Sequence, residues 1–358
     1  MLSAFGNILG RPLSWFLGTS PRGSDQRPQS MAPGPDQPQT SISNPISSSA
    51  TETFEPRILD VLVVKAMLSK AFALPVEITN SVLDMAEYWP HSSTVELVRR
   101  TMFGSRNEDE LLARSRPVGF NVPLRPPQTH NDDPSDDNRQ GHFCFPVKTP
   151  YSLEAFQKAT GSPDPLLEHP CRKIVFTIRS HDQGWGGDHA DHGSYRSSWT
   201  WFDAGLEKFD ADVFGTDGKP EEEVVFDVNR LGSVWPEAVQ ASATANRPDP
   251  RNPSKQNWRY IFQHKLLPDP AHMIQANILA KRDYTIHKVE WRWTDDIEPE
   301  SPEAEDELSA SGRGKATGNG EFVRSLTLGD VVTVWGRARF PAWANHVHSV
   351  QIDVYWAV

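Results

Sequence analysis

Short runs of alternating hydrophobic and polar residues fill the second half of the chain. In the run KIVFTIRS, Ile174, Phe176 and Ile178 fall on one side of an extended chain, because successive side chains of a strand point to opposite faces. The runs SWTWF and HSVQIDVYWAV alternate in the same way, and turns rich in Gly, Pro and Asp separate the runs. This pattern predicts a mainly β domain over residues 143–358, an antiparallel β-sandwich or jelly roll.

A different periodicity marks residues 56–103. Apolar residues recur there every three or four positions, which is the spacing of one helix face. Pro75 separates two such stretches and suits the first turn of the second helix, and Glu77 lies favourably near that N-terminus. We therefore expect a small helical subdomain over residues 56–103, packed on the β-domain or near it.

Three stretches show neither pattern. Residues 1–55 are rich in Pro, Ser, Gln and Thr, residues 104–142 contain the polar run THNDDPSDDNRQGH, and residues 295–320 are acidic with few aromatic residues. Such compositions favour disorder. We expect a disordered N-terminal region, a linker, and a disordered acidic insert within the β-domain.

The first residues of the chain carry an apolar stripe at helical spacing. Over residues 2–16 this stripe is compatible with an interfacial helix that contacts a membrane, and over residues 1–22 with a mitochondrial targeting sequence. A third interpretation is a short peptide that docks on the protein itself or stays loose. Pro12 interrupts the stripe, and only Arg11 and Arg22 are basic there, which favours the third interpretation.

Charge and cysteine content narrow the function classes. The formal net charge is −11, which argues against a nucleic-acid partner, because such binders usually carry a basic surface. The two cysteines, Cys144 and Cys171, form no metal or disulfide pattern, so we expect a cytoplasmic or nuclear protein. The chain has no Gly-X-Ser-X-Gly elbow and no phosphate-binding P-loop. We expect no cofactor.

Chemically active residue types concentrate in SHDQGWGGDHADHGSYRSSWTWF, residues 180–202. Nitrogen and oxygen ligands suited to iron or zinc stand close together there: His181, His189, Asp191 and His192. One interpretation is therefore a metal-dependent enzyme. A glycine-rich loop holds ligands less firmly than a strand does, which weighs against this interpretation.

Two other interpretations concern the same stretch. In the first, Asp182 and the following glycines shape a structural turn, and Trp185 folds back over the core. In the second, Trp185 is exposed and binds a peptide or a glycan, while Asp182, Gln183 and Arg196 fix the polar groups of that ligand. Loops at the end of a sandwich often carry such a function.

A second aromatic and polar loop lies near the C-terminus, in RARFPAWANHVHS. It contains Trp343 and Asn345 between two expected strands. Alternate loops of a sandwich meet at one end. We therefore expect Trp185 and Trp343 to line the same rim, with Asn345 as a further ligand contact.

The helical segment contains the run LPVEI, with Leu74, Pro75, Glu77 and Ile78, followed by an apolar pair. The run resembles the start of an F-box, in which a Leu-Pro-X-Glu-Ile sequence opens a helix. The resemblance covers about ten residues and implies a helix face for a ubiquitin-ligase adaptor. PHSSTV follows Trp89 where an F-box continues with further helices.

Longer motifs support a second resemblance. SHDQGW, SWTWFDAGLE, IHKVEWRWTDD and the final run GDVVTVWGRARFPAWANHVHSVQIDVYWAV resemble an uncharacterised fungal protein family, over roughly residues 170–358 and the helical segment. That family has no assigned activity. The β-domain also resembles galactose-binding-like sandwiches, including those that follow F-boxes in substrate receptors of ubiquitin ligases, which is an analogy at the level of fold.

Together these patterns predict a non-catalytic recognition module. Its ligand would be polar, a peptide or a glycan, held at the rim around Trp185 and Trp343. The two alternatives are an F-box-like substrate receptor of a ubiquitin ligase and a metal-dependent enzyme.

Overall fold

The computed structural model describes residues 55–126, 144–161, 166–212, 226–241 and 260–358. All of them belong to one compact unit that begins at residue 53. The predictions for the membrane-contact stripe, for the targeting sequence and for the N-terminal region up to residue 54 lie outside the described residues.

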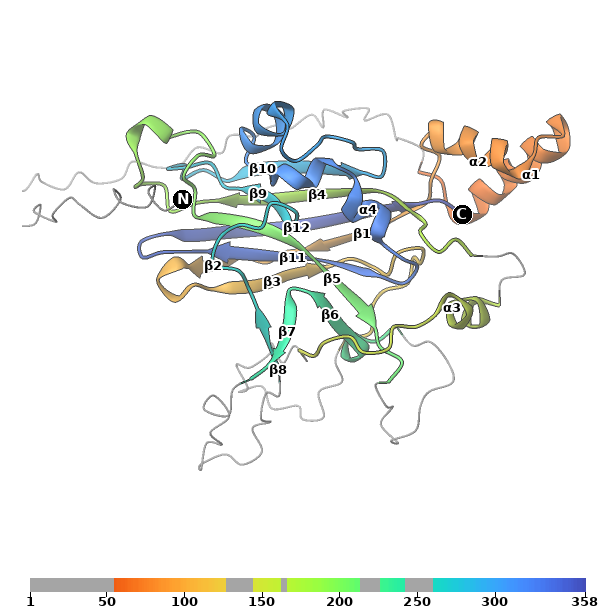
Figure 1. Cartoon of the computed structure of the whole chain (residues 1–358), viewed down its shortest axis with the longest axis horizontal. Coiled ribbons are helices and arrows are strands. Elements are labelled where there is room, and N and C mark those ends of the chain that lie inside the picture. The colour runs from red at the N-terminus through yellow and green to blue at the C-terminus, as the bar shows by residue number, and fades with distance from the viewer. Residues whose placement is uncertain (1–54, 127–143, 162–165, 213–225, 242–259) are drawn as a thin grey trace, which may run out of the picture. The chain divides into compact units, whose positions relative to one another are not determined.

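Two five-stranded antiparallel sheets form the centre of this unit (Figure 1). The first sheet has the order β1-β12-β4-β10, with β2 also paired to β12: β1 (His91–Glu96), β2 (Arg100–Phe103), β4 (Cys171–His181), β10 (Thr285–Arg292) and β12 (Ala344–Trp356). The second has the order β3-β11-β5-β6, with β9 also paired to β5: β3 (Asp109–Arg114), β5 (Thr200–Phe209), β6 (Leu231–Trp235), β9 (Met273–Ala276) and β11 (Val331–Ala338). A smaller antiparallel pair joins β7 (Glu237–Gln240) to β8 (Tyr260–Gln263). The predicted mainly β sandwich is confirmed.

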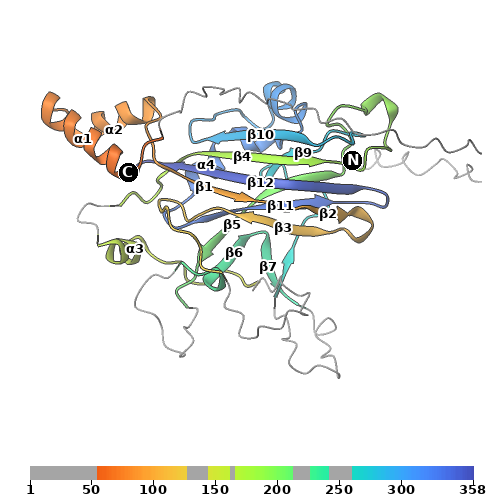
Figure 2. The ribbon, with the colours of Figure 1, turned by 180° about the vertical axis from the view of Figure 1, so that it is seen from behind.

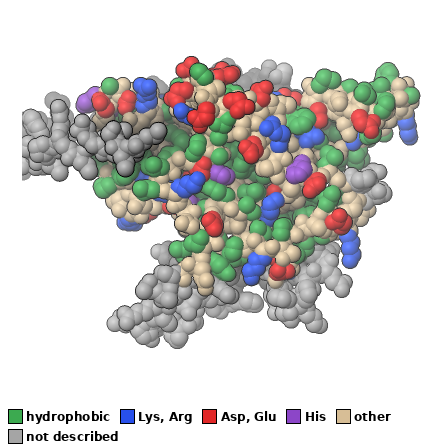
Figure 3. All heavy atoms as spheres, in the orientation of Figure 1, with side chains coloured by type: hydrophobic (Ala, Val, Ile, Leu, Met, Phe, Trp, Pro, Cys, Tyr) green, Lys and Arg blue, Asp and Glu red, His purple; other side chains and the backbone are tan. Residues whose placement is uncertain are grey.

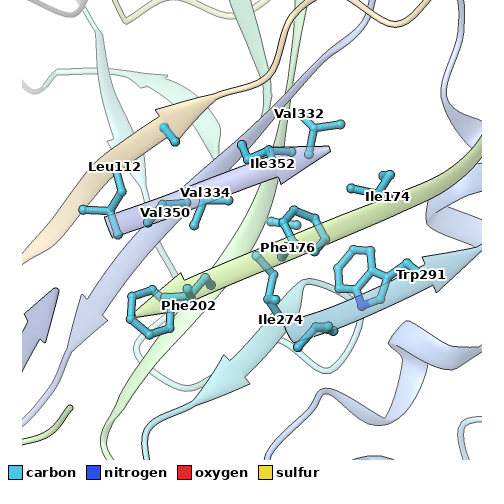
Figure 4. Packing of buried hydrophobic residues seen from close by; sticks show 14 of the residues in the cluster. Leu112, Ile174, Phe176, Phe202, Ile274, Trp291, Val332, Val334, Val350 and Ile352 are labelled. Carbon is cyan, nitrogen blue, oxygen red and sulfur yellow. The ribbon is translucent and has the colours of Figure 1, made fainter. Parts of the chain in front are cut away.

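The main hydrophobic core lies between the two large sheets (Figure 4). Ile174, Phe176 and Ile178 of β4 are all fully buried, as their alternation predicts. Phe202 from β5 and Val334 from β11 reach the same core from the second sheet. Because burying one such side chain contributes roughly 1.5–3 kcal/mol, this layer is the main source of stability for the sandwich.

Two helices precede the sandwich, α1 (Ile58–Phe72) and α2 (Val76–Met85). Pro75 stands directly before α2, as its restricted backbone favours. The Asp84 carboxylate of α2 accepts hydrogen bonds from the Trp89 indole at 2.8 Å and from Arg172 at 3.1 Å. The Lys65 ammonium of α1 donates to the backbone carbonyl of Val358 at 2.6 Å. The hairpin is therefore anchored at the C-terminal end of β12 (Figure 2).

Among the described residues, no helix combines the length and the apolar character needed to cross a membrane.

The structure corrects the predicted extents of the helical subdomain and the linker. Helix α2 ends at Met85, and residues 91–103, expected to be helical, form β1 and β2. The backbone of β1 pairs with β12 along its whole length, from His91 opposite Tyr355 to Glu96 opposite Val350. The expected linker 104–142 contains β3, which pairs with β11. Tertiary pairing with long central strands overrides the polar composition of these short segments.

The acidic insert 295–320 is also ordered, contrary to its predicted disorder. It contains one turn of π-helix, η4 (Ala304–Ser309), and the 3-10 helix η5 (Lys315–Gly318), and the helix α4 (Glu321–Ser325) follows. Ala304 and Leu308 are buried beneath the charged residues. The insert also accepts and donates backbone hydrogen bonds at β9: the amide of Ala276 donates to Gly312, and the amide of Gly314 donates to Met273. The buried Ala304 and Leu308, together with the backbone hydrogen bonds to β9, thus hold the acidic insert on the second sheet.

Candidate functional site

The loop that follows β4 is built around the carboxylate of Asp182. This side chain is 0% exposed and accepts three backbone N–H groups, from Ala280 at 2.6 Å, Gly184 at 2.7 Å and Lys281 at 3.0 Å. Burial raises the pKa of Asp182, and the three backbone donors act against that rise. The expectation that Asp182 contacts a ligand is therefore wrong, because both of its oxygens hold the loop in place. The interpretation of Asp182 as a turn residue is the one that the structure supports.

Trp185 lies at the tip of this loop and points outwards. Its exposed fraction is 54%, so it does not fold back over the core. Gly184, Gly186 and Gly187 on both sides of it all have positive φ, a conformation that favours glycine. A Cβ atom at Gly184 would collide with the side chain of Arg282, so the loop is also closely packed. The indole of Trp185 is therefore exposed on a loop whose conformation is held in place by its glycines and its close packing.

Gln183 connects this loop to the turn between β11 and β12. Its side-chain oxygen accepts from the backbone N–H of Ala344 at 3.3 Å, and its side-chain nitrogen donates to the carbonyl of Trp185 at 2.6 Å. The loops that carry Trp185 and Trp343 therefore meet at one end of the sandwich, as expected. Gln183 itself is engaged at both ends of its amide.

Asn345 does not face this end of the molecule. Its side chain is fully buried and donates to the carbonyls of Arg337 at 3.1 Å and Trp201 at 3.2 Å. It also accepts from the Asn277 amide at 2.9 Å. The predicted ligand contact at Asn345 is corrected to a core residue that joins the two sheets.

The turn between β11 and β12 brings further aromatic residues to the same end. Phe340 and Ala342 have φ values of 66° and 75°, which cost non-glycine residues roughly 1–2 kcal/mol each. Phe340 is 37% exposed and packs edge-on against Trp199, with ring centroids 4.6 Å apart. The turn after β2 joins them, because the amide of Gly104 donates to the carbonyl of Trp343 at 2.8 Å. Phe103, directly before it, is exposed.

We call this group of aromatic side chains the rim: Phe103, Trp185, Trp199, Phe340 and Trp343. Trp343 and Trp199 are half-buried, and the other three are exposed. The sequence predicted Trp185 and Trp343 for this place. It did not predict Phe103, Trp199 or Phe340 there, although Phe340 stands three residues from Trp343 in the same loop.

The candidate metal ligands do not form one site. His181 lies on β4 and stacks on His346 of β12, with ring centroids 4.5 Å apart. The other three lie on or beside the 3-10 helix η2 (His189–Asp191), where Asp191 accepts from the Ser197 hydroxyl at 2.8 Å. In the described part of the chain, no group of three or more His, Cys, Asp or Glu residues is arranged to hold a metal ion. The four predicted ligands do not converge, because His181 lies on strand β4 and the other three lie on or beside η2 in a surface loop.

Arg196 is exposed on the loop beyond η2. Lys315 is the main cause that lowers the pKa of Glu305 in the acidic insert, and the charge of Arg196 adds to this effect. Arg196 thus lies within electrostatic reach of η4. Its predicted role as a ligand contact stays a prediction.

A second exposed surface lies on α1 and α2. Of the predicted partner-helix residues, Leu74 is half-buried, and Pro75, Glu77 and Ile78 are exposed. Nine large apolar side chains of the two helices are exposed: Ile58, Leu59, Leu62, Val63, Met67, Phe72, Val76, Ile78 and Met85. We call these nine residues the hairpin surface (Figure 3). Only Val61 of α1 is fully buried.

Comparison of the chain with protein-family models, with curated proteins and with solved structures finds no match. The rim and the hairpin surface therefore have to be interpreted from their own contacts.

Proposed function

We propose that the protein is a non-catalytic recognition module and that its rim binds a peptide or a glycan. The observation that carries this proposal is the exposed indole of Trp185 on a loop that a buried carboxylate fixes through three backbone hydrogen bonds. A loop fixed before binding loses little conformational freedom on binding. Tryptophan is also among the residue types that contribute most to binding energy at interfaces.

Trp185→Ala is expected to weaken ligand binding about tenfold or more while the melting temperature stays within about 2 °C of the wild type. The indole touches solvent rather than core, so its loss leaves no large cavity. The measurement is binding of the purified full chain to a glycan array and to a random peptide display library, beside a thermal melt. Leu97→Ala, a change at an exposed apolar position outside the rim and the hairpin surface, is the control. Unchanged binding of Trp185→Ala on both supports would contradict the proposal.

The hairpin surface supports a second candidate function, a substrate receptor of a ubiquitin ligase. Helix α1 is apolar on almost all sides, which is typical of a helix that becomes covered. The exposed side chains lie at the spacing by which helices dock into partner grooves. In such a receptor the hairpin would bind the adaptor, and the rim at the other end of β12 would bind the substrate.

Ile78→Asp is expected to abolish capture of a purified ubiquitin-ligase adaptor by the full chain, because a carboxylate cannot be buried in an apolar interface without a large cost. The measurement is a pull-down with defined concentrations of both proteins. Val95→Asp, at an exposed apolar position on β1, is the control and should retain capture. A wild-type chain that captures no adaptor rules out this second function and leaves the rim proposal untouched.

Three expectations from the sequence belong to the same proposal. They are the likeness of the sandwich to galactose-binding-like domains, the likeness to the fungal family, and a cytoplasmic or nuclear location. The antiparallel sandwich is compatible with the first of them.

A further inference from the structure

We infer that two copies of this protein associate through α1, in an antiparallel pairing of the two helices about a two-fold axis. The inference is independent of what the rim binds, because α1 is anchored at the other end of β12 (Figure 1). It follows from the pattern of side chains on the solvent side of α1 and from the charges at the two ends of this helix.

The solvent side of α1 carries a stripe with the spacing of a helix–helix contact. Four exposed positions lie along it at intervals of four, three and four residues: Leu59, Val63, Ala66 and Lys70. Two helices that pack along each other use this spacing. Leu62 and Met67 are exposed on the two sides of the stripe. The opposite side of α1 faces the protein, where Val61 is buried and Lys65 donates to the carbonyl of Val358.

The hairpin surface is large enough for a specific contact between two copies. Its nine apolar side chains are between 37% and 79% exposed. Together they offer on the order of 800 Å², which is more than the largest apolar patch of a typical monomer and about what each partner contributes to a specific interface. An apolar surface of this size is expected to be covered by a partner.

The charges of α1 favour a second copy as that partner. Asp60 lies in the first turn of α1, and Lys70 lies in its last turn. In an antiparallel pair centred on the middle of the stripe, Leu59 packs against the aliphatic part of Lys70 of the second copy, and Val63 lies beside Ala66. The ammonium of Lys70 then reaches the carboxylate of Asp60 of the second copy. The two-fold axis forms this ion pair twice, as a self-complementary interface requires.

Other arrangements and partners fit these charges less well. A parallel pairing would place Asp60 beside Asp60 and Lys70 beside Lys70, and like charges at such positions repel. The formal net charge of −11 opposes binding of the hairpin surface to an anionic membrane. The adaptor of the second candidate function would compete with the second copy for part of the hairpin surface.

A dimer of this kind would join two rims in one particle. Each rim lies at the end of β12 away from α1, so both rims stay open to ligand. A ligand that is presented in several copies would then be held by both rims at once, and its apparent affinity would rise without any new contact at either rim. This consequence rests on the proposed function of the rim; the dimer itself does not.

The test is sedimentation velocity of the purified full chain over a range of protein concentrations. We expect a shift from monomer to dimer with a Kd of roughly micromolar size. Val63→Asp should weaken this self-association about tenfold or more, because it places a carboxylate in the apolar centre of the contact. Leu97→Asp, at an exposed apolar position outside the hairpin surface and the rim, should leave self-association unchanged. Thermal melts of each variant separate loss of contact from loss of fold.

Charge reversal tests the antiparallel arrangement. Lys70→Glu alone should weaken the dimer, because it places a second carboxylate beside Asp60 of the other copy. Asp60→Lys alone should also weaken it, because it brings two ammonium groups together. An equimolar mixture of the two variants should recover dimers, since both contacts between the unlike chains then join opposite charges. Far-UV circular dichroism of each variant checks that α1 stays helical.

Four outcomes would overturn the inference. The first is a full chain that stays monomeric at every concentration. The second is self-association that Val63→Asp leaves unchanged, which would place the contact elsewhere. The third is a mixture of the charge variants that recovers no dimer, which would rule out the antiparallel pairing. The fourth is a monomeric chain that binds vesicles of phosphatidylcholine with phosphatidylserine and loses this binding in Val63→Asp, which would assign α1 to a membrane. None of these results bears on the rim, which Trp185→Ala tests separately.

Discussion

Replacing Arg337 with methionine is expected to lower the free energy of unfolding by about 3–5 kcal/mol. Arg337 lies on β11 and is 1% exposed. Its guanidinium donates to the carboxylates of Asp109 and Asp203 and to the carbonyl of Lys265. Asp203 is equally buried, so the variant leaves its carboxylate inside the protein without its main cation. Urea unfolding at pH 8, followed by tryptophan fluorescence, measures the loss.

The size of this loss should depend on pH. Burial raises the pKa of Asp203 to about 7, and Arg337 acts against the rise. Below about pH 7 the carboxyl group of Asp203 holds a proton and needs no cation; above it, the charged form depends on Arg337. We therefore expect a smaller difference between wild type and variant at pH 5 than at pH 8.

Two further variants make this prediction specific. In Arg337→Met combined with Asp203→Asn, no unpaired charge remains at position 203, so part of the stability should return at pH 8. Arg106→Met, at an exposed ion pair with Glu108, should change stability by less than about 1 kcal/mol. Equal losses for Arg337→Met at both pH values would show that lost packing, and not the uncovered charge, causes the effect.

Asp182→Ala is expected to lower the free energy of unfolding by about 2–4 kcal/mol and to abolish binding at the rim. The change removes the acceptor of three backbone N–H groups, and an unsatisfied buried donor costs roughly 1–3 kcal/mol unless water reaches it. Asp182→Asn keeps one acceptor oxygen, so its loss should be intermediate. Urea unfolding of both variants, beside Trp185→Ala, gives the comparison.

Comparing the variants at positions 182 and 185 separates two roles. Asp182 holds the conformation of the loop, and Trp185 is proposed to contact the ligand. Both Asp182→Ala and Trp185→Ala should lose binding, but only Asp182→Ala should lose stability. An Asp182→Ala variant as stable as the wild type would mean that the three hydrogen bonds contribute little and that the loop is not rigid. The proposed rim would then lack the ordered loop on which it depends.

Alternation along the chain was sufficient to predict the long central strands. Ile174, Phe176 and Ile178 face the core because a strand that is buried on one face must place every second side chain there. The strand β1 was missed because HSSTVE has a weak alternation and follows a helix, so that only its pairing with β12 defines it. The acidic insert was misjudged because its overall charge hides Ala304 and Leu308, which hold it in place.

The rim was predictable only in part. An exposed tryptophan between glycines was one of the interpretations that the sequence left open, and the structure supports it at Trp185. Asp182 and Asn345 were misjudged because a sequence does not show whether a polar group faces solvent or satisfies buried backbone. Phe103 joins the rim through the pairing of β2 with β12, in which Phe103 lies opposite Ala344, and through the contact of Gly104 with Trp343. No local pattern in the sequence contains this long-range proximity.

The position of β12 also determines when the first sheet can form during synthesis. This strand lies far along the chain from β1, β2 and β4, yet it pairs with all three within the first sheet. Synthesis runs from the N-terminus, so β1 and β2 emerge long before β12 and wait without their partner. Unpaired strand edges of this kind are prone to aggregation. We expect the first sheet to close only after β12 has been synthesised, and a premature stop codon shortly before Ala344 to remove the strand on which the other three depend.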